Sequence, residues 1–196
     1  MAARKFVVDT CSLVNFFKYH YFDKKHGGQI NKALIDFIVG KVMADEILII
    51  DKVDAEAQTW PEYGNIRARF VSKIIGTDHL SDQIMRLSNS YVIKENEEKI
   101  KSQSGEVAGA NIIDIERSRF ENKYADLFLI AYCNSIKNGL DEVVLITEET
   151  HNRESQKLYP KLPVLCDAEH INWHDLSYLL FENYRKQLKF SLEIVP

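Results

Sequence analysis

Lys5-Phe-Val-Val-Asp-Thr-Cys-Ser-Leu-Val14 places a strand, an acid and the start of a helix in immediate succession. Phe6 to Val8 form an apolar run that is typical of a short, fully buried strand. Asp9 follows at once, and an apolar helical pattern begins beyond Thr10. A carboxylate fixed where a buried strand ends loses hydration, which is unfavourable unless a positive charge or hydrogen bonds compensate it. Asp9 is therefore the first candidate for a functional residue.

Two further acidic positions have comparable surroundings. Asp126 opens an apolar helix in Tyr124-Ala-Asp-Leu-Phe-Leu-Ile-Ala131, and Glu148-Glu149 follows the apolar strand Glu142-Val-Val-Leu-Ile-Thr147. In parallel α/β sheets, ligands bind beyond the carboxyl ends of the strands. Carboxylates that meet there suit a hard divalent cation, which prefers oxygen ligands. The pattern predicts one divalent-metal site and, with it, a metal-dependent enzyme.

The composition is typical of one globular α/β domain. The chain has 196 residues, of which 45% are hydrophobic, and a formal net charge of -4, so no global basic surface for nucleic acid is expected. Without a Cys-x-x-Cys pair, a disulfide framework or a structural zinc site is not expected, and apolar neighbours predict buried thiols. The three cysteines are Cys11, Cys133 and Cys166. No apolar stretch is long enough to span a bilayer, so no membrane partner is expected, and a reducing cytoplasm is the expected location.

Strand and helix patterns alternate and predict a parallel sheet covered by helices on both faces. The expected strands are Phe6–Val8, Ile47–Ile50, Val143–Ile146 and a short edge strand at Leu162–Cys166. Helical spacing is expected after Thr10, at 30–38, from Val53 to Ala57, across about 67–89, at 125–136 and from Asp175. The polar residues 94–122 are interpreted as exposed helix and loop of the same domain, because no second core pattern follows them.

Four segments together resemble the PIN-domain family, the nuclease fold of many toxin–antitoxin ribonucleases. They are Phe6-Val-Val-Asp-Thr-Cys-Ser-Leu-Val14, the acid in Val53-Asp-Ala-Glu56, Ala125-Asp-Leu-Phe-Leu-Ile-Ala131 and Leu145-Ile-Thr-Glu-Glu149, in the family's order and spacing. Leu162-Pro-Val-Leu-Cys-Asp167 is similar to a poorly characterised PIN-like branch. The resemblance implies a three-layer α/β/α fold with a central parallel sheet. It also implies a single domain over residues 1–196, in which residues 94–122 are an insertion.

The resemblance also implies a site for one or two Mg²⁺ or Mn²⁺ ions. The family's fourth acid follows two residues after a Thr or Ser, and Thr147 and Glu149 fill those positions here. The family more often has Asp there, so Glu149 departs from its pattern, and the neighbouring Glu148 could substitute. The ligands carried over, in order, are Asp9, Glu56, Asp126 and Glu149.

Each acid also has an interpretation without a metal. Asp9 fits a helix N-cap, and Asp126 fits a first-turn acid that the helix dipole favours. Glu56 could be a solvated acid or exchange its role with Asp54. Glu149 could belong to a solvated loop pair.

The activity that the resemblance implies is that of a metal-dependent endoribonuclease, the toxin of a toxin–antitoxin pair. Its partners would be an RNA substrate, an antitoxin protein and a second copy of the chain. A non-catalytic PIN-like module that binds protein or RNA is the alternative that the Glu149 departure and the acidic net charge favour. A second alternative is a structure-selective DNA nuclease that uses the same acids.

Overall fold

The computed structural model describes residues 4–21, 32–60, 63–137, 142–150 and 157–188. Four parallel strands form one sheet in the order β2-β1-β3-β4. The strands are β1 Arg4–Val8, β2 Ile47–Leu48, β3 Glu142–Ile146 and β4 Asn172–His174. In the register, Val7 of β1 lies opposite both Leu48 and Leu145. The carboxyl ends of β1 and β3 therefore meet at one edge of the sheet, where an acid follows each strand.

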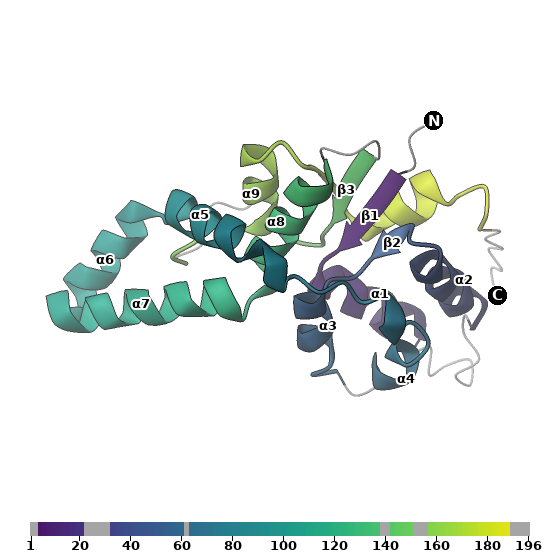
Figure 1. Ribbon diagram of the computed structural model, residues 1–196, viewed down its shortest axis with the longest axis horizontal. Coiled ribbons are helices and arrows are strands. Elements are labelled where there is room, and N and C mark those ends of the chain that lie inside the picture. The colour runs from purple at the N-terminus through teal and green to yellow at the C-terminus, as the bar shows by residue number, and fades with distance from the viewer. Residues whose placement is uncertain (1–3, 22–31, 61–62, 138–141, 151–156, 189–196) are drawn as a thin grey trace, which may run out of the picture.

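Helices cover both faces of the sheet, which gives the three-layer α/β/α fold expected from the sequence (Figure 1). The α-helices are α1 Thr10–Tyr21, α2 Lys32–Met43, α3 Asp51–Ala57, α4 Tyr63–Arg67, α5 Ser81–Tyr91, α6 Lys94–Ser104, α7 Glu106–Asn122, α8 Ala125–Lys137 and α9 Leu162–Ala168. Two 3₁₀ turns, η2 Val71–Lys73 and η3 Asp78–Leu80, precede α5, and η4 Tyr178–Asn183 is π-helical. None of the helices in the described ranges is long and apolar enough to cross a membrane.

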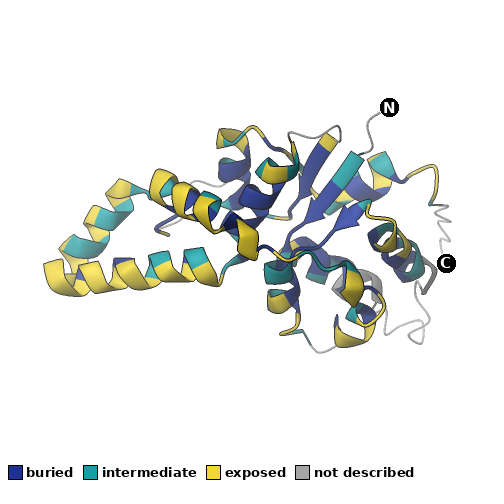
Figure 2. Cartoon of the chain, in the orientation of Figure 1, coloured by how far each residue is buried: buried dark blue, intermediate teal, exposed yellow. Residues whose placement is uncertain are grey.

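The core runs without interruption from the sheet into α8. Consecutive residues are buried in β1, at Phe6–Val8, and in β3, at Val143–Ile146, as expected for a sheet covered on both faces. Helix α8 likewise buries every residue from Leu127 to Cys133. Figure 2 shows the buried strands at the centre of the molecule. Asp126 directly precedes the buried run of α8, so its carboxylate belongs to the margin of the core.

Two expectations from the sequence are wrong. Leu162–Cys166 is not an edge strand but forms most of helix α9. Pro163 is compatible with this helix because it lies in the first turn, where a main-chain N–H has no hydrogen-bond acceptor within the helix. The fourth strand is instead β4, which lacks an apolar run. The segment 67–89 is not one helix either. Ile75 pairs with Ile50 in an isolated parallel bridge, which interrupts the helical path between η2 and α5.

Residues 94–122 form a helical hairpin, α6 and α7, that projects from the sheet domain (Figure 1). Its outer surface is largely exposed, as the polar sequence predicts (Figure 2). Gly109 of α7 packs so closely on α6 that a Cβ atom there would lie 2.6 Å from Lys101 Cα. At the base of the hairpin, the Phe120 ring stacks on Tyr159 with a centroid separation of 4.0 Å. The hairpin is therefore tightly packed internally and anchored to the domain by an aromatic pair.

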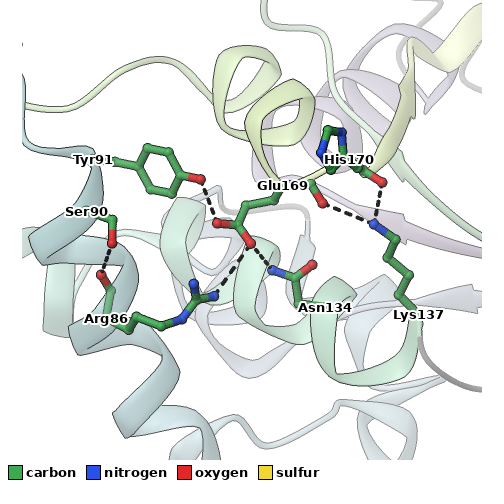
Figure 3. A network of polar contacts seen from close by, with 7 residues as sticks. All are labelled: Arg86, Ser90, Tyr91, Asn134, Lys137, Glu169 and His170. Carbon is green, nitrogen blue, oxygen red and sulfur yellow. Dashed lines mark hydrogen bonds and ion pairs between the residues drawn. The ribbon is translucent and has the colours of Figure 1, made fainter.

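Glu169, the residue after α9, links three helices (Figure 3). Its carboxylate accepts hydrogen bonds from Tyr91 of α5 and Asn134 of α8, both at 2.6 Å, and lies 3.5 Å from the Arg86 guanidinium. The Lys137 ammonium donates to the Glu169 main-chain carbonyl. Burial alone would raise the pKa of Glu169, but these donors outweigh it and lower the pKa. The network holds the end of α9 against α5 and α8.

Candidate functional site

Asp9 lies between β1 and α1 and is only 4% exposed. Its main-chain N–H donates to the Ile146 carbonyl of β3 at 3.0 Å. Its Oδ1 accepts the Ser12 N–H at 2.6 Å, so Asp9 is the N-cap of α1. Its Oδ2 accepts the Thr147 hydroxyl at 2.7 Å. Because each carboxylate oxygen has a second lone pair, Asp9 can cap the helix and still accept another ligand.

Thr147 connects Asp9 to Glu149. The buried Thr147 hydroxyl donates to Asp9 and accepts the Glu149 N–H at 3.1 Å. The Glu149 carboxylate accepts the main-chain N–H that begins α9, at 3.0 Å. The neighbouring Glu148 carboxylate turns elsewhere and accepts the Leu176 N–H at 2.7 Å. The structure thus places Glu149, and not Glu148, beside the other predicted acids.

Glu56, on α3, joins the starts of two other helices. One carboxylate oxygen accepts the Thr10 hydroxyl of α1, and the other accepts the Ala125 N–H of α8 at 3.1 Å. An acid at a helix N-terminus is stabilised by the helix dipole and by unpaired N–H groups. These contacts bring Glu56 to the first turn of α8, which also carries Asp126.

Asp54, the alternative to Glu56, has a different environment. Its buried carboxylate accepts the Tyr63 hydroxyl at 2.9 Å and the Arg67 Nε at 2.8 Å, and the Gln58 amide also donates to it. A buried carboxylate with this many donors is a structural link between α3 and α4. The geometry therefore favours Glu56 over Asp54 as the acid of the site.

Asp126 is half-buried in the first turn of α8. Among the described residues, none donates a hydrogen bond to its carboxylate. It lines a cavity of about 300 Å³ together with Glu56 and Glu149. Three of the predicted acids, from distant parts of the chain, therefore share one cavity, with Asp9 linked to it through Thr147. The other lining residues are Glu116, Phe120, Tyr124 and Lys157.

The charges of neighbouring acids act on Asp126 and on Asp9. Desolvation, followed by the charges of Glu149, Glu56 and Asp9, raises the pKa of Asp126 to about 7. Desolvation likewise raises the pKa of Asp9 to about 6, although its hydrogen bonds oppose the increase and the Glu149 charge adds to it. Like charges held this close disfavour full ionisation. The cluster therefore favours protonation or a bound cation at neutral pH.

Cys11 adjoins this cluster and is exposed, which corrects the expectation that all three cysteines are buried. Desolvation of the thiol and then the charges of Asp9, Glu149, Asp126 and Glu56 raise the pKa of Cys11 to about 11. The thiol is therefore protonated at neutral pH and is a poor metal ligand. What remains is a set of carboxylate oxygens, whose chemistry fits Mg²⁺ or Mn²⁺ rather than a softer metal.

In the described part of the chain, no three Asp, Glu, His or Cys side chains are arranged so that they could hold one ion as they stand. The hydrogen bonds explain this, since both oxygens of Glu56 and one of Glu149 are directed at donors from the protein. Ion binding would require these two side chains to turn toward Asp126. Glutamate has the rotatable bonds to do so.

Sequence reasoning missed Glu116 and Lys157, both of which line the cavity. Glu116 lies in the hairpin, where the polar pattern of 94–122 singles out no residue. Lys157 lies between β3 and α9, outside any strand or helix. No motif or periodicity marks either position, so only the folded chain brings them to the acids.

Comparison with known proteins finds one family. The sequence model of a domain of unknown function, DUF4411, matches residues 71–187, which is more than half of the chain. This range includes the hairpin, Asp126, Glu149 and Lys157, while Asp9 and Glu56 precede it. Neither the curated proteins nor the solved structures give a significant match. The chain therefore belongs to the DUF4411 family.

Proposed function

We propose that this protein is a metal-dependent nuclease that hydrolyses RNA phosphodiester bonds. The observation that carries the proposal is the convergence of Asp9, Glu56, Asp126 and Glu149, from four separate segments, at the carboxyl edge of a parallel sheet. Carboxylates whose neighbouring charges raise the pKa of Asp126 and Asp9 are costly for stability, and such arrangements concentrate at functional sites.

The four carboxylates would hold Mg²⁺ or Mn²⁺. When bound, the ion would activate water for attack on phosphorus and neutralise charge on the phosphate oxygens. The hydroxyl of Thr147 orients Asp9 and fixes the main chain of Glu149. Glu56 and Glu149 would release hydrogen bonds to the starts of α8 and α9 as they turn into the cavity. No covalent protein intermediate is needed.

The cellular role extends this proposal. The resemblance to PIN domains supports a toxin of a toxin–antitoxin pair, with an antitoxin protein as partner and a homodimer as the assembly. A structure-selective DNA nuclease would use the same acids, and a comparison of single-stranded RNA with flap or hairpin DNA separates the two substrates.

A second candidate is a non-catalytic module. It is favoured by the hydrogen bonds that Glu56 and Glu149 make to helix starts, because these contacts stabilise the fold without any ion. Addition of Mn²⁺ distinguishes the candidates. A metal enzyme gains thermal stability as its sites fill, whereas a module without a metal site does not.

Cleavage of a mixed RNA pool in Mn²⁺ tests the proposal. Glu149→Gln and Asp126→Asn should each lower the rate by about a hundredfold or more, since each removes a charge from the cation site. Glu148→Gln is the matched control, because it alters the adjacent acid that faces away, and it should retain the wild-type rate. Cleavage that persists in EDTA, or equal loss in Glu148→Gln and Glu149→Gln, would contradict the proposed site.

A further inference from the structure

The charge of the cavity is unfavourable for binding a polyanion. Glu56, Glu116, Asp126 and Glu149 all line it. A phosphodiester that enters must overcome their repulsion even when one cation has been bound, because the four carboxylates exceed its charge. A positive side chain at the cavity would reduce this repulsion.

Lys157 is the single basic side chain among the described residues that line the cavity. Its charge acts on the site, since it opposes the increase in the pKa of Asp126. No described carboxylate lies within ion-pair distance of its ammonium group. Arg67, by comparison, is paired with Asp54 at 2.8 Å. Lys157 is therefore close enough to influence the acids without being paired to one of them.

The main chain around Lys157 is held from three directions. Its carbonyl accepts the Asn96 side-chain amide at 2.7 Å, and the next carbonyl accepts the Ile93 N–H at 2.9 Å. Two residues on, Tyr159 is buried, hydrogen-bonds to Ser88 and stacks on the hairpin. The backbone is thus fixed at the cavity while the side chain is exposed. A fixed main chain and an ammonium group with no carboxylate partner among the described residues suit the capture of an incoming anion.

We propose that Lys157 binds a non-bridging phosphate oxygen of single-stranded nucleic acid at the mouth of the acidic cavity. This inference rests on the proposed function and assigns a substrate-binding residue outside the four acids. A purely structural role, in which Lys157 only offsets the acids, makes a different prediction for RNA. Removal of the lysine charge would then leave RNA binding unchanged.

The test measures binding of a fluorescent single-stranded RNA by anisotropy over a range of salt concentrations, in a Glu149→Gln background that limits cleavage. Adding Lys157→Met should weaken binding about tenfold, because one charge-assisted phosphate contact is lost. It should also reduce the slope of log affinity against log salt by about 0.7. Lys157→Arg should restore most of the affinity. Lys99→Met, which removes an exposed lysine of α6 outside the cavity, is the matched control and should change neither quantity.

The outcomes separate this inference from the nuclease proposal. Cleavage by the wild-type protein with unchanged affinity and salt slope in Lys157→Met overturns the role of Lys157 and leaves the nuclease in place. Weaker binding in Lys157→Met by a protein that never cleaves supports Lys157 and overturns the nuclease. A wild-type protein that neither binds nor cleaves RNA overturns both. An equal effect of Lys99→Met would show that only net charge matters and would also overturn the inference.

Discussion

Replacing Asp126 by Asn should stabilise the metal-free protein at alkaline pH. The pKa of Asp126 is about 7 in the native protein, against an ordinary value of 3.8. Between these pH values the native state binds a proton that the unfolded state does not, so stability falls as the pH rises from about 4 to about 7. The full difference corresponds to roughly 4 kcal/mol. Screening by water and relaxation of the neighbouring acids reduce the expected gain to about 2 kcal/mol.

Urea unfolding in EDTA at pH 5 and pH 8 measures this effect through linear extrapolation. The advantage of Asp126→Asn should be larger at pH 8 than at pH 5, because asparagine does not ionise as the pH rises. Asp114→Asn, an exposed acid on the hairpin, controls for the change of charge and should have little effect at either pH. Saturating Mn²⁺ should reverse the order at pH 8, since the wild-type protein gains about 2.7 kcal/mol at a hundredfold excess over Kd. An Asp126→Asn protein less stable than wild type at pH 8 in EDTA would refute the electrostatic reasoning.

Four other substitutions have defined outcomes. Gly109→Ala should destabilise the protein by about 1–3 kcal/mol in urea unfolding, because the new Cβ meets the main chain of α6, whereas Gly40→Ala, with open space around it, should stabilise it by about 0.5–1 kcal/mol. Thr147→Val should cost about 1–3 kcal/mol by calorimetry, since it leaves Asp9 without its buried hydroxyl donor, and unchanged stability would mean that water replaces it. The lowered pKa of Glu169 means that its carboxylate stabilises the fold above the ordinary pKa of 4.5, and that this contribution is lost as the pH falls through the native pKa. Glu169→Gln should remove the contribution. The loss of stability with falling pH, followed by circular dichroism, should then be less steep than in the wild-type protein.

The sheet and its acidic edge were predictable from local patterns. β1, β3 and α8 are consecutive apolar runs, which indicate burial. The β-branched residues of β1 and β3 and the greater length of α8 indicate the type of each element. Asp9 and Asp126 stand at the ends of these runs, so the same patterns located them. Glu56 was predictable only through the resemblance to PIN domains, because nothing local distinguishes it from Asp54. Their different partners, Ala125 for one and Arg67 for the other, become visible only in the folded chain.

The errors have physical causes. The apolar residues of Leu162–Cys166 fit a strand or a buried helix equally well, and Pro163 is compatible with an edge strand and with a first helical turn. The interpretation of 67–89 as a helix overlooked the pairing of Ile75 with Ile50, a contact between distant parts of the chain that no local period encodes. Lys157 was missed for the same reason, since its importance depends on which residues surround it.

Three of the four acids also stabilise the start of a helix, which affects how the site would change over evolutionary time. Asp9 caps α1, Glu56 accepts the first N–H of α8, and Glu149 accepts the first N–H of α9. These carboxylates therefore stabilise helices whether or not the protein cuts RNA. A descendant that had lost the activity would still be under selection to keep them. The Asp126 carboxylate makes no such stabilising hydrogen bond among the described contacts, and its negative charge is unfavourable for the fold. Its retention or loss in other members of the family would therefore be the more direct record of whether they carry out the proposed reaction.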